Sequence, residues 1–435
     1  MRDVDLARLF ENAFPNTLDT TVSWHVDKAG KGTKIGKSKP NQYAFVGKEE
    51  WRGAQSFIVT GDITAEWIRD STNQLQGYQA LATKDPGLQT LILGAINTQA
   101  EYMVLSPYCN AFQPPPPSGL GSASGGANDI VSPAYDSNIV AECKYELDSL
   151  AHFLRLANEF HKHTKSIEFL TPRFYSALRS VLDVIKQQSL GSFDEETGQY
   201  VRNEYRFQRQ TNIGTETLSL SGVGNPIKGG TGLVRSAFRP SDDATILPFF
   251  IPANAMMVVE LKRMATILSG ASKKELATEL SEFAENIDGG IRKYGIIKNE
   301  EFGDVYAYEV DGYGSHILMD DANLPSLLSL PHLGFVDVAD PIYQNTRKMI
   351  LSKSGNPYYL EGEEFSGIGG PHVGLSHAWP MSRLIQAMTS DNDTEIMNSI
   401  VAVRDSSKLG LVHESVNVRA SVSYTRELLA DTLII

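Results

Sequence analysis

The chain has 435 residues, of which 41% are hydrophobic and 21% charged, so it can form a large core and is not collagen-like, disordered or a coiled coil. Its 52 acidic side chains outnumber the 39 basic ones, which gives a formal net charge of −13. Because this charge repels phosphate groups, we expect no nucleic acid partner.

Helical periodicity is the main structural signal along the chain. The first clear helix follows Asp85-Pro86, where a capping aspartate precedes a proline at the first helical position. Apolar residues then recur at helical spacing over 147–157, over 174–185 after Thr171-Pro172, and over 276–287. Further helices are expected over 253–268, 323–330 and 378–389.

Strand-like segments are short and scattered, at 43–46, 57–60, 200–207 and 305–310. They do not alternate with helices in the βαβ rhythm that a parallel sheet requires, so we interpret them as hairpins on loops between helices. No segment approaches the roughly 18 consecutive apolar residues of a membrane span. With only Cys109 and Cys143, a disulfide framework or cysteine zinc site is excluded, and a single bridge stays open.

The segment 61–71 gathers residues suited to sugar binding. Asp62, Trp67, Arg69 and Asp70 lie within it. A tryptophan stacks on the C–H face of a sugar ring, while arginine and aspartate bind pairs of hydroxyl groups. A surface helix start with a local Arg–Asp ion pair explains the same residues equally well.

Two acidic pairs, Asp242-Asp243 and Asp320-Asp321, each precede an apolar helical run. A helix N-terminus stabilises carboxylates, so capping accounts for one aspartate in each pair and leaves the second unexplained. The second pair lies between His316 and Asn323, which makes it a candidate sugar-binding cluster. A glycine loop with a capped helix is an equal alternative there.

Acid/base chemistry is suggested by the acidic pair at 242–243 and by Glu414. Glycoside hydrolysis needs one carboxylic acid to protonate the leaving oxygen and a second carboxylate as base or nucleophile. Repulsion between adjacent aspartates would raise the pKa of one of them, which suits the acid. Taken alone, Glu414 is equally well explained as a solvated glutamate. His372 and Trp379 are candidates for a hydroxyl donor and an aromatic wall, although a lone histidine is more often structural.

Several enzyme classes lack their signature motifs. The chain has no HExxH, no GxGxxG after a strand, no GxxxxGK[ST], no GxSxG and no CxxC. A metal site built from the two aspartate pairs is conceivable, but nothing in their spacing requires one. We therefore expect neither a metal nor a cofactor.

In order and spacing, these motifs resemble glycoside hydrolase family 125, the exo-α-1,6-mannosidases, and in particular its fungal branch. The resemblance spans nearly the whole chain and differs at the end, where 427–435 stands in place of an aromatic-rich helix. It rests on residues 10–19, 61–71, 107–112, 142–148, 238–244, 251–254, 319–323, 370–372 and 413–415.

The resemblance implies an all-α fold, with residues 1–435 forming a single (α/α)6 barrel that carries short β-hairpins on its loops. It also implies metal-independent, inverting release of terminal mannose from α-1,6-mannosides. The expected partners are mannose-bearing oligosaccharides or N-glycan fragments. Because fungal members often carry a leader or anchor, we expect the secretory pathway, with the cytoplasm as the alternative.

The resemblance also assigns roles. The general base is Glu414, and the general acid is Asp242 or Asp243, with Asp242 favoured. Inversion leaves room for a water molecule, so their carboxyl groups should lie roughly 6.5–9.5 Å apart. The expected substrate-binding residues are Asp62, Trp67, Arg69, Asp70, Arg239, His316, Asp320, Asp321, Asn323, His372, Trp379 and His413.

Two other functions stay open. The first is an (α/α)6 exo-glycosidase that acts on α-glucosides, because the Trp-x-Arg-Asp stretch is shared more widely than the mannosidase motifs. The second is a glycan-binding protein without turnover. Retention of both Glu414 and the 242–243 pair argues against the second, because binding alone requires no acid and base.

Overall fold

The computed structural model describes residues 3–28, 51–123, 128–407, 410–419 and 424–425. Within these ranges the chain is helix-rich, with twelve α-helices and seventeen short strands. The expected strand at 43–46 and the chain end at 427–435 lie outside the described residues.

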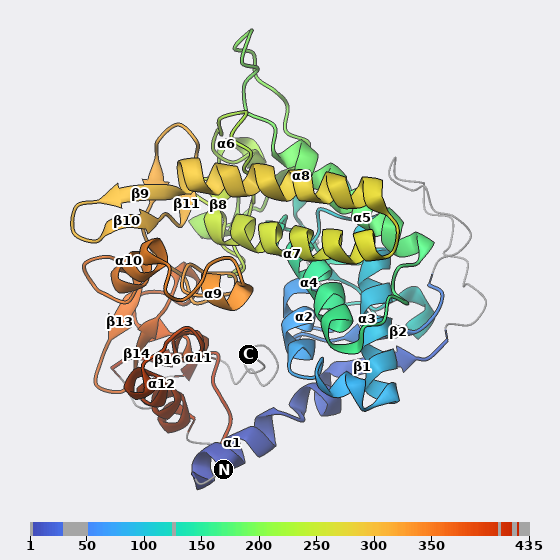
Figure 1. The fold of residues 1–435 in the computed structure, drawn as a ribbon, viewed down its shortest axis with the longest axis horizontal. Coiled ribbons are helices and arrows are strands. Elements are labelled where there is room, and N and C mark those ends of the chain that lie inside the picture. The colour runs from blue at the N-terminus through green and yellow to red at the C-terminus, as the bar shows by residue number, and fades with distance from the viewer. Residues whose placement is uncertain (1–2, 29–50, 124–127, 408–409, 420–423, 426–435) are drawn as a thin grey trace.

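The helices follow one another around the molecule in chain order (Figure 1). In this view α2 to α5 lie on the right, α7 and α8 run side by side across the top, and α9 to α12 lie on the left. The helices are α1 (Val4–Ala13), α2 (Ile68–Gln76), α3 (Pro86–Leu105), α4 (Leu147–Thr164), α5 (Pro172–Gln188), α6 (Ser219–Gly222), α7 (Ile251–Gly270), α8 (Lys274–Gly290), α9 (Leu330–Leu333), α10 (Pro341–Ile350), α11 (Pro380–Met388) and α12 (Asp393–Ser406).

The predicted proline-led helix starts are confirmed. The Asp85 carboxylate accepts hydrogen bonds from the backbone N–H groups of Gly87 and Leu88 at 2.9 and 3.1 Å, and α3 begins with Pro86. The Thr171 hydroxyl accepts from the N–H of Phe174 at 3.2 Å, and α5 begins with Pro172. Each cap satisfies N–H groups that the first turn leaves without a helical partner.

The helix expected over 323–330 is wrong. Pro325 lacks a backbone N–H and disfavours helical geometry in the residue before it. The N–H groups of Leu327 and Leu328 donate to the Asp320 carboxylate at 2.8 and 2.9 Å, so a side chain takes the place of helical carbonyls. The helix in this region, α9, begins only at Leu330.

The strands form small antiparallel sheets of two or three members. The hairpin interpretation holds for β9 and β10, which are consecutive partners. The strand β2 likewise pairs with the strand before it, β1. The interpretation is wrong for β7, which pairs with β5 across the intervening helices α4 and α5. The strands are β1 (Val22–Val26), β2 (Gln55–Ile58), β3 (Glu66–Trp67), β4 (Ala111–Phe112), β5 (Ile130–Ser132), β6 (Val140–Glu142), β7 (Arg206–Gln208), β8 (Phe249–Phe250), β9 (Ile296–Asn299), β10 (Gly303–Tyr306), β11 (Glu309–Val310), β12 (His316–Ile317), β13 (Tyr359–Glu361), β14 (Ser366–Ile368), β15 (His377–Ala378), β16 (Ser415–Asn417) and β17 (Tyr424–Thr425).

One large apolar cluster of buried side chains extends from Trp51 to Ile385 and forms the core. Helix α4 contributes residues from all its faces, because it packs against α2, α3 and α7 at once. Within the described ranges, no helix has both the length and the apolar character needed to cross a bilayer.

Candidate active site

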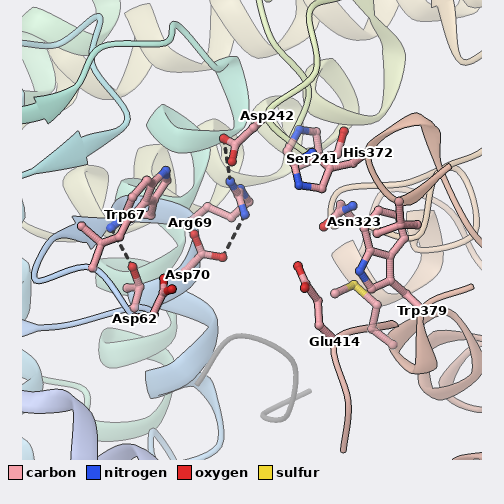
Figure 2. Close-up of a pocket in the computed structure, with 16 residues that line it drawn as sticks. Asp62, Trp67, Arg69, Asp70, Ser241, Asp242, Asn323, His372, Trp379 and Glu414 are labelled. Atoms are coloured by element: carbon pink, nitrogen blue, oxygen red, sulfur yellow. Dashed lines mark hydrogen bonds and ion pairs between the residues drawn. The ribbon is translucent and has the colours of Figure 1, made fainter. Parts of the chain in front are cut away.

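A pocket of about 780 Å³ is lined by residues from widely separated parts of the chain. One wall comes from residues within 60–70, the next from 240–242, and the opposite wall from residues within 372–381, together with Asn323 and Glu414. Figure 2 shows these side chains directed into a common space. Sites of this kind, with convergent polar groups in a cleft, are the usual location of binding or catalysis.

The first wall is formed by β3 and the first turn of α2. Trp67 is extended, and its N–H donates to the Thr60 hydroxyl at 3.1 Å. The N–H of Ile68 donates to the carbonyl of Asn110 at 3.1 Å, which ties the start of α2 to the strand β4. This anchoring places Arg69 and Asp70 at the pocket.

Arg69 contacts four carboxylates. Its guanidinium lies 2.8 Å from Asp70, 3.6 Å from Asp148, 3.7 Å from Asp242 and 3.9 Å from Glu146. The Arg69 side chain is only 10% exposed. A solvated helix start with a local ion pair is therefore the wrong interpretation of this segment.

The acidic groups around Arg69 have perturbed pKa values. Burial raises the pKa of Asp70 to about 6 and that of Asp148 to about 7. Burial also raises the pKa of Glu146 well above its usual range. The positive charge of Arg69 lowers each of these pKa values, but this single cation does not outweigh the effect of burial on the three acids. Strongly perturbed carboxyl groups in a cleft mark a candidate functional site.

Asp242 lies at the tip of a tight turn. The N–H of Asp242 donates to the carbonyl of Arg239, and the N–H of Arg239 donates to the carbonyl of Asp243, at 2.9 and 2.8 Å. Asp242 has a φ of 68°, in the left-handed region that aspartate tolerates better than most residues. The turn directs Asp242 into the pocket with its side chain 30% exposed.

Asp243 has a different environment. It is buried outside the pocket lining, and its carboxylate accepts a hydrogen bond from the Ser241 hydroxyl at 2.9 Å. The pKa of Asp242 is lowered, because Lys144, Arg69 and His372 together outweigh the upward effect of burial. The expectation that the neighbouring aspartate raises the pKa of Asp242 is therefore wrong.

The opposite wall carries Glu414 and Trp379. Glu414 immediately precedes β16, Trp379 immediately follows β15, and these two strands pair with each other. The ring of His372 stacks near Trp379, with centroids 6.4 Å apart. In Figure 2 Glu414 enters the pocket from the wall opposite Arg69 and Asp70, while Asp242 enters from a third direction.

Of the residues expected to bind substrate, seven line the pocket: Asp62, Trp67, Arg69, Asp70, Asn323, His372 and Trp379. The other five do not line it: Arg239, His316, Asp320, Asp321 and His413. Arg239 is buried in an ion pair with Glu309 at 2.6 Å, and His316 is exposed on β12. His413 is also buried outside the lining.

The acidic pair at 320–321 supports the pocket from behind. Asp320 caps the turn at 327–328, and burial raises its pKa to about 8. Asp321 accepts hydrogen bonds from the backbone N–H and side-chain amide of Asn323 at 2.9 and 2.8 Å. It therefore orients a pocket residue. Neither acidic pair caps an α-helix, so that interpretation of both pairs is also wrong.

Sequence reasoning missed Lys144, Glu146 and Asp148 as members of the site. Glu146 precedes α4 and Asp148 lies in its first turn, which is an ordinary position for acidic residues. Glu146 and Asp148 contact Arg69 because α4 packs against α2, and the local sequence does not reveal this packing.

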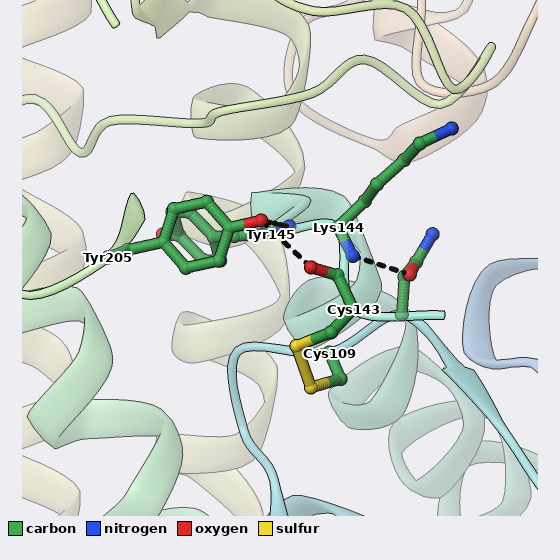
Figure 3. The surroundings of a disulfide bond; sticks show 6 residues. Cys109, Cys143, Lys144, Tyr145 and Tyr205 are labelled. Carbon is green, nitrogen blue, oxygen red and sulfur yellow. Dashed lines mark hydrogen bonds between the residues drawn. A yellow bond between two sulfur atoms is a disulfide. The ribbon is translucent and has the colours of Figure 1, made fainter. Parts of the chain in front are cut away.

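A disulfide joins Cys109 to Cys143, the residue that precedes Lys144 (Figure 3). The next residue, Asn110, donates from its side chain to Glu146 at 2.9 Å and accepts from the N–H of Lys144 at 3.0 Å. The Tyr205 hydroxyl bridges the Cys143 carbonyl and the Tyr145 N–H, each at 2.9 Å. The open question of pairing is thus answered: Cys109 and Cys143 form a bridge.

No cluster of three or more potential metal ligands occurs among the residues that the structure describes.

Comparison with known proteins gives consistent results. A family model described as metal-independent α-mannosidase (GH125) matches residues 3–432. The meiotically up-regulated gene 157 protein of Schizosaccharomyces pombe is 52% identical over 427 residues, covering 98% of this chain and 80% of that protein. A solved metal-independent α-mannosidase of Streptococcus pneumoniae, in a non-productive complex with α-1,6-mannobiose, is 30% identical with a TM-score of 0.83. That similarity covers 99% of this chain and 92% of the solved one.

Proposed function

Because the chain belongs to glycoside hydrolase family 125, the metal-independent α-mannosidases, we propose that it is an inverting exo-enzyme that releases terminal mannose from α-1,6-mannosides. The observation that carries the proposal is the entry of Asp242 and Glu414 into one pocket from different walls. Support for the linkage comes from the Streptococcus pneumoniae relative, which was solved with α-1,6-mannobiose.

In the proposed reaction, Glu414 removes a proton from a water molecule as that water attacks the anomeric carbon. Asp242 gives a proton to the glycosidic oxygen as the bond to the anomeric carbon breaks. The products are one mannose of inverted configuration and a shortened glycan. A separation of roughly 6.5–9.5 Å between the two carboxyl groups stays a prediction of this mechanism.

The remaining pocket residues would hold the terminal sugar. Trp67 or Trp379 would stack on its apolar face, while Arg69 and Asp70 bind a pair of hydroxyl groups. Asn323, His372 and Asp62 are further hydroxyl partners in this proposal, and Asp321 keeps Asn323 in place. Closure of the pocket at one end would confine cleavage to chain ends.

We also propose that residues 1–435 form one (α/α)6 barrel domain. The order of the helices around the molecule and the single large apolar cluster support this architecture. A location in the secretory pathway is proposed as well, because disulfides such as Cys109–Cys143 persist mainly in oxidising compartments. Fractionation of the tagged protein in its own cells would test the location.

A linkage-defined substrate panel tests the function. We expect the protein to cleave α-1,6-mannobiose much faster than the α-1,2, α-1,3 and α-1,4 isomers, and not to cleave isomaltose. Faster cleavage of isomaltose would favour the α-glucosidase alternative. Binding of mannobiose without turnover would favour the glycan-binding alternative. The Glu414→Gln variant provides the blank for contaminating glycosidases.

A further inference from the structure

The four carboxylates around Arg69 exceed the positive charge available to them. Glu146 and Asp148 are fully buried, and both lie within 4 Å of the guanidinium that also serves Asp70 and Asp242. Several like charges cannot all be ionised in so dry a site, so the cluster must retain protons at neutral pH.

The neighbouring elements supply little further positive charge to balance these carboxylates. Lys144 acts on Asp242 but is also 3.5 Å from Glu142, while Arg209 pairs with Glu142 and Asp129. On α4, His152 faces the cluster through Asp148, but burial lowers its pKa to about 3, which leaves it neutral. From the opposite wall, His372 acts on Asp242.

Glu146 is well placed to hold one of these protons. Its Oε1 accepts from the Asn110 amide and its Oε2 from the Ser149 hydroxyl, both at 2.9 Å. Of the four acids it is the farthest from Arg69, at 3.9 Å, and its side chain has no exposure to water. A carboxyl group with weak ionic compensation and full burial favours its neutral form.

Glu146 also lies beside the proposed acid. Its Oε2 and the Oδ1 of Asp242 are directed at the same nitrogen of Arg69, at 3.9 and 3.7 Å. Among the described residues, no donor reaches Oδ1 of Asp242 at ordinary hydrogen-bonding distance. A protonated Glu146 carboxyl would supply this donor, and hydrogen bonding from Glu146 is among the causes that lower the pKa of Asp242.

A general acid must carry a proton when the substrate arrives, but the surroundings of Asp242 favour its ionised form. We propose that Glu146 and Asp242 share a single proton, and that Glu146 is the positioning residue that keeps this proton next to the catalytic acid. The inference rests on the proposed function, because it assigns the source of the acid's proton.

The proton balance of the cycle is simple. The shared proton passes from Glu146 to Asp242, and Asp242 gives it to the glycosidic oxygen as the C–O bond breaks. Glu414 takes one proton from the attacking water and releases it to solvent. The carboxylate pair then regains one proton from solvent through the pocket, where Asp242 is 30% exposed, so no net proton is consumed.

The test is the pH dependence of kcat/KM on α-1,6-mannobiose. In Glu146→Gln, Asp242 has to hold the proton alone, so the loss of activity on the alkaline side should begin at least one pH unit lower than in the wild type. Activity at pH 7 should fall at least tenfold, with a smaller loss at pH 5. A 2,4-dinitrophenyl α-mannoside, whose leaving group needs no proton, should lose less than threefold.

The matched control is Asp148→Asn, which removes a carboxylate from the same guanidinium. It should shift the pH at which activity is lost on the alkaline side by less than half as much as Glu146→Gln does. Equal shifts in both variants would overturn the proposal, because net charge alone would then explain them. An unshifted Glu146→Gln profile, or equal losses on both substrates, would also overturn it.

Ser149→Ala gives an independent test if Glu146→Gln fails to fold. Removing the hydroxyl that donates to Oε2 disfavours ionised Glu146, so the pair keeps its proton to higher pH. The loss of activity on the alkaline side should therefore begin at a higher pH than in the wild type. A loss that begins at the same pH or at a lower pH would contradict the proposal. Failure of the wild type to cleave mannobiose would refute the proposed function instead.

Discussion

At the scale of single residues, the catalytic assignment depends on Glu414 acting as the base. We predict that Glu414→Ala lowers kcat on α-1,6-mannobiose by about 10²- to 10⁴-fold, the usual range for a lost general base. Added azide should restore turnover and yield β-mannosyl azide, because a small anion can occupy the space of the attacking water. Wild-type turnover in the variant, or an α-configured azide, would contradict the assignment.

Gly370 permits the close packing behind Trp379 and Asp321. A Cβ at this position would lie 2.5 Å from Asp321 Oδ2 and 2.8 Å from Trp379 Cζ3. We predict that Gly370→Ala displaces the aromatic wall and raises KM at least tenfold. Gly121→Ala, where a Cβ meets nothing within 4 Å, is the control and should behave like the wild type. Equal KM values in the two variants would contradict the packing argument.

At the scale of elements, the Cys109–Cys143 bridge links the residues that flank the paired strands β4 and β6. We predict that the double Cys→Ser variant loses about 2–4 kcal/mol of unfolding free energy, as expected for a disulfide that closes a 34-residue separation. Activity should fall as well, because Asn110 would no longer hold Glu146 and Lys144 firmly. Chemical denaturation and mannobiose kinetics measure the two effects, and unchanged stability would contradict this role.

The strand β3 carries the buried Glu66, and burial raises the pKa of this carboxyl group to about 8. A carboxyl group with a raised pKa in the folded state contributes stability below its ordinary pKa and loses this contribution as pH rises through the folded value. The contribution of Glu66 to folding stability is therefore lost progressively as the pH rises from about 4.5 to about 8.

Glu66→Gln should remove this dependence. We predict that the Tm of the variant falls less than that of the wild type between pH 5 and pH 8. Parallel Tm curves would show that Glu66 is not protonated in the folded protein.

At the scale of the whole molecule, the sequence predicted the features that have local causes. Helices α3 and α5 have proline-led starts and capping side chains, and both were predicted. The helix expected over 323–330 was wrong, because periodicity there does not reveal that Asp320 takes up the free N–H groups. The pocket residues of segment 61–71 were found because aromatic and charged side chains are unusually dense there.

Other parts of the site depend on contacts that local sequence does not encode. The choice of Asp242 over Asp243 follows from the turn geometry at 239–243, which directs only Asp242 into the pocket. Glu146 reaches Arg69 through the packing of α4 on α2. Taken alone, Glu414 is equally well explained as a solvated glutamate, and only the family resemblance assigned it the role of general base.

The most direct test of the central claim is the configuration of the first product. In an NMR time course on α-1,6-mannobiose, single-displacement attack by a water held at Glu414, with protonation from Asp242, predicts that β-mannose appears first and then mutarotates to the α-anomer. Appearance of α-mannose as the initial product would show retention and would contradict the assignment of Glu414 and Asp242 as base and acid.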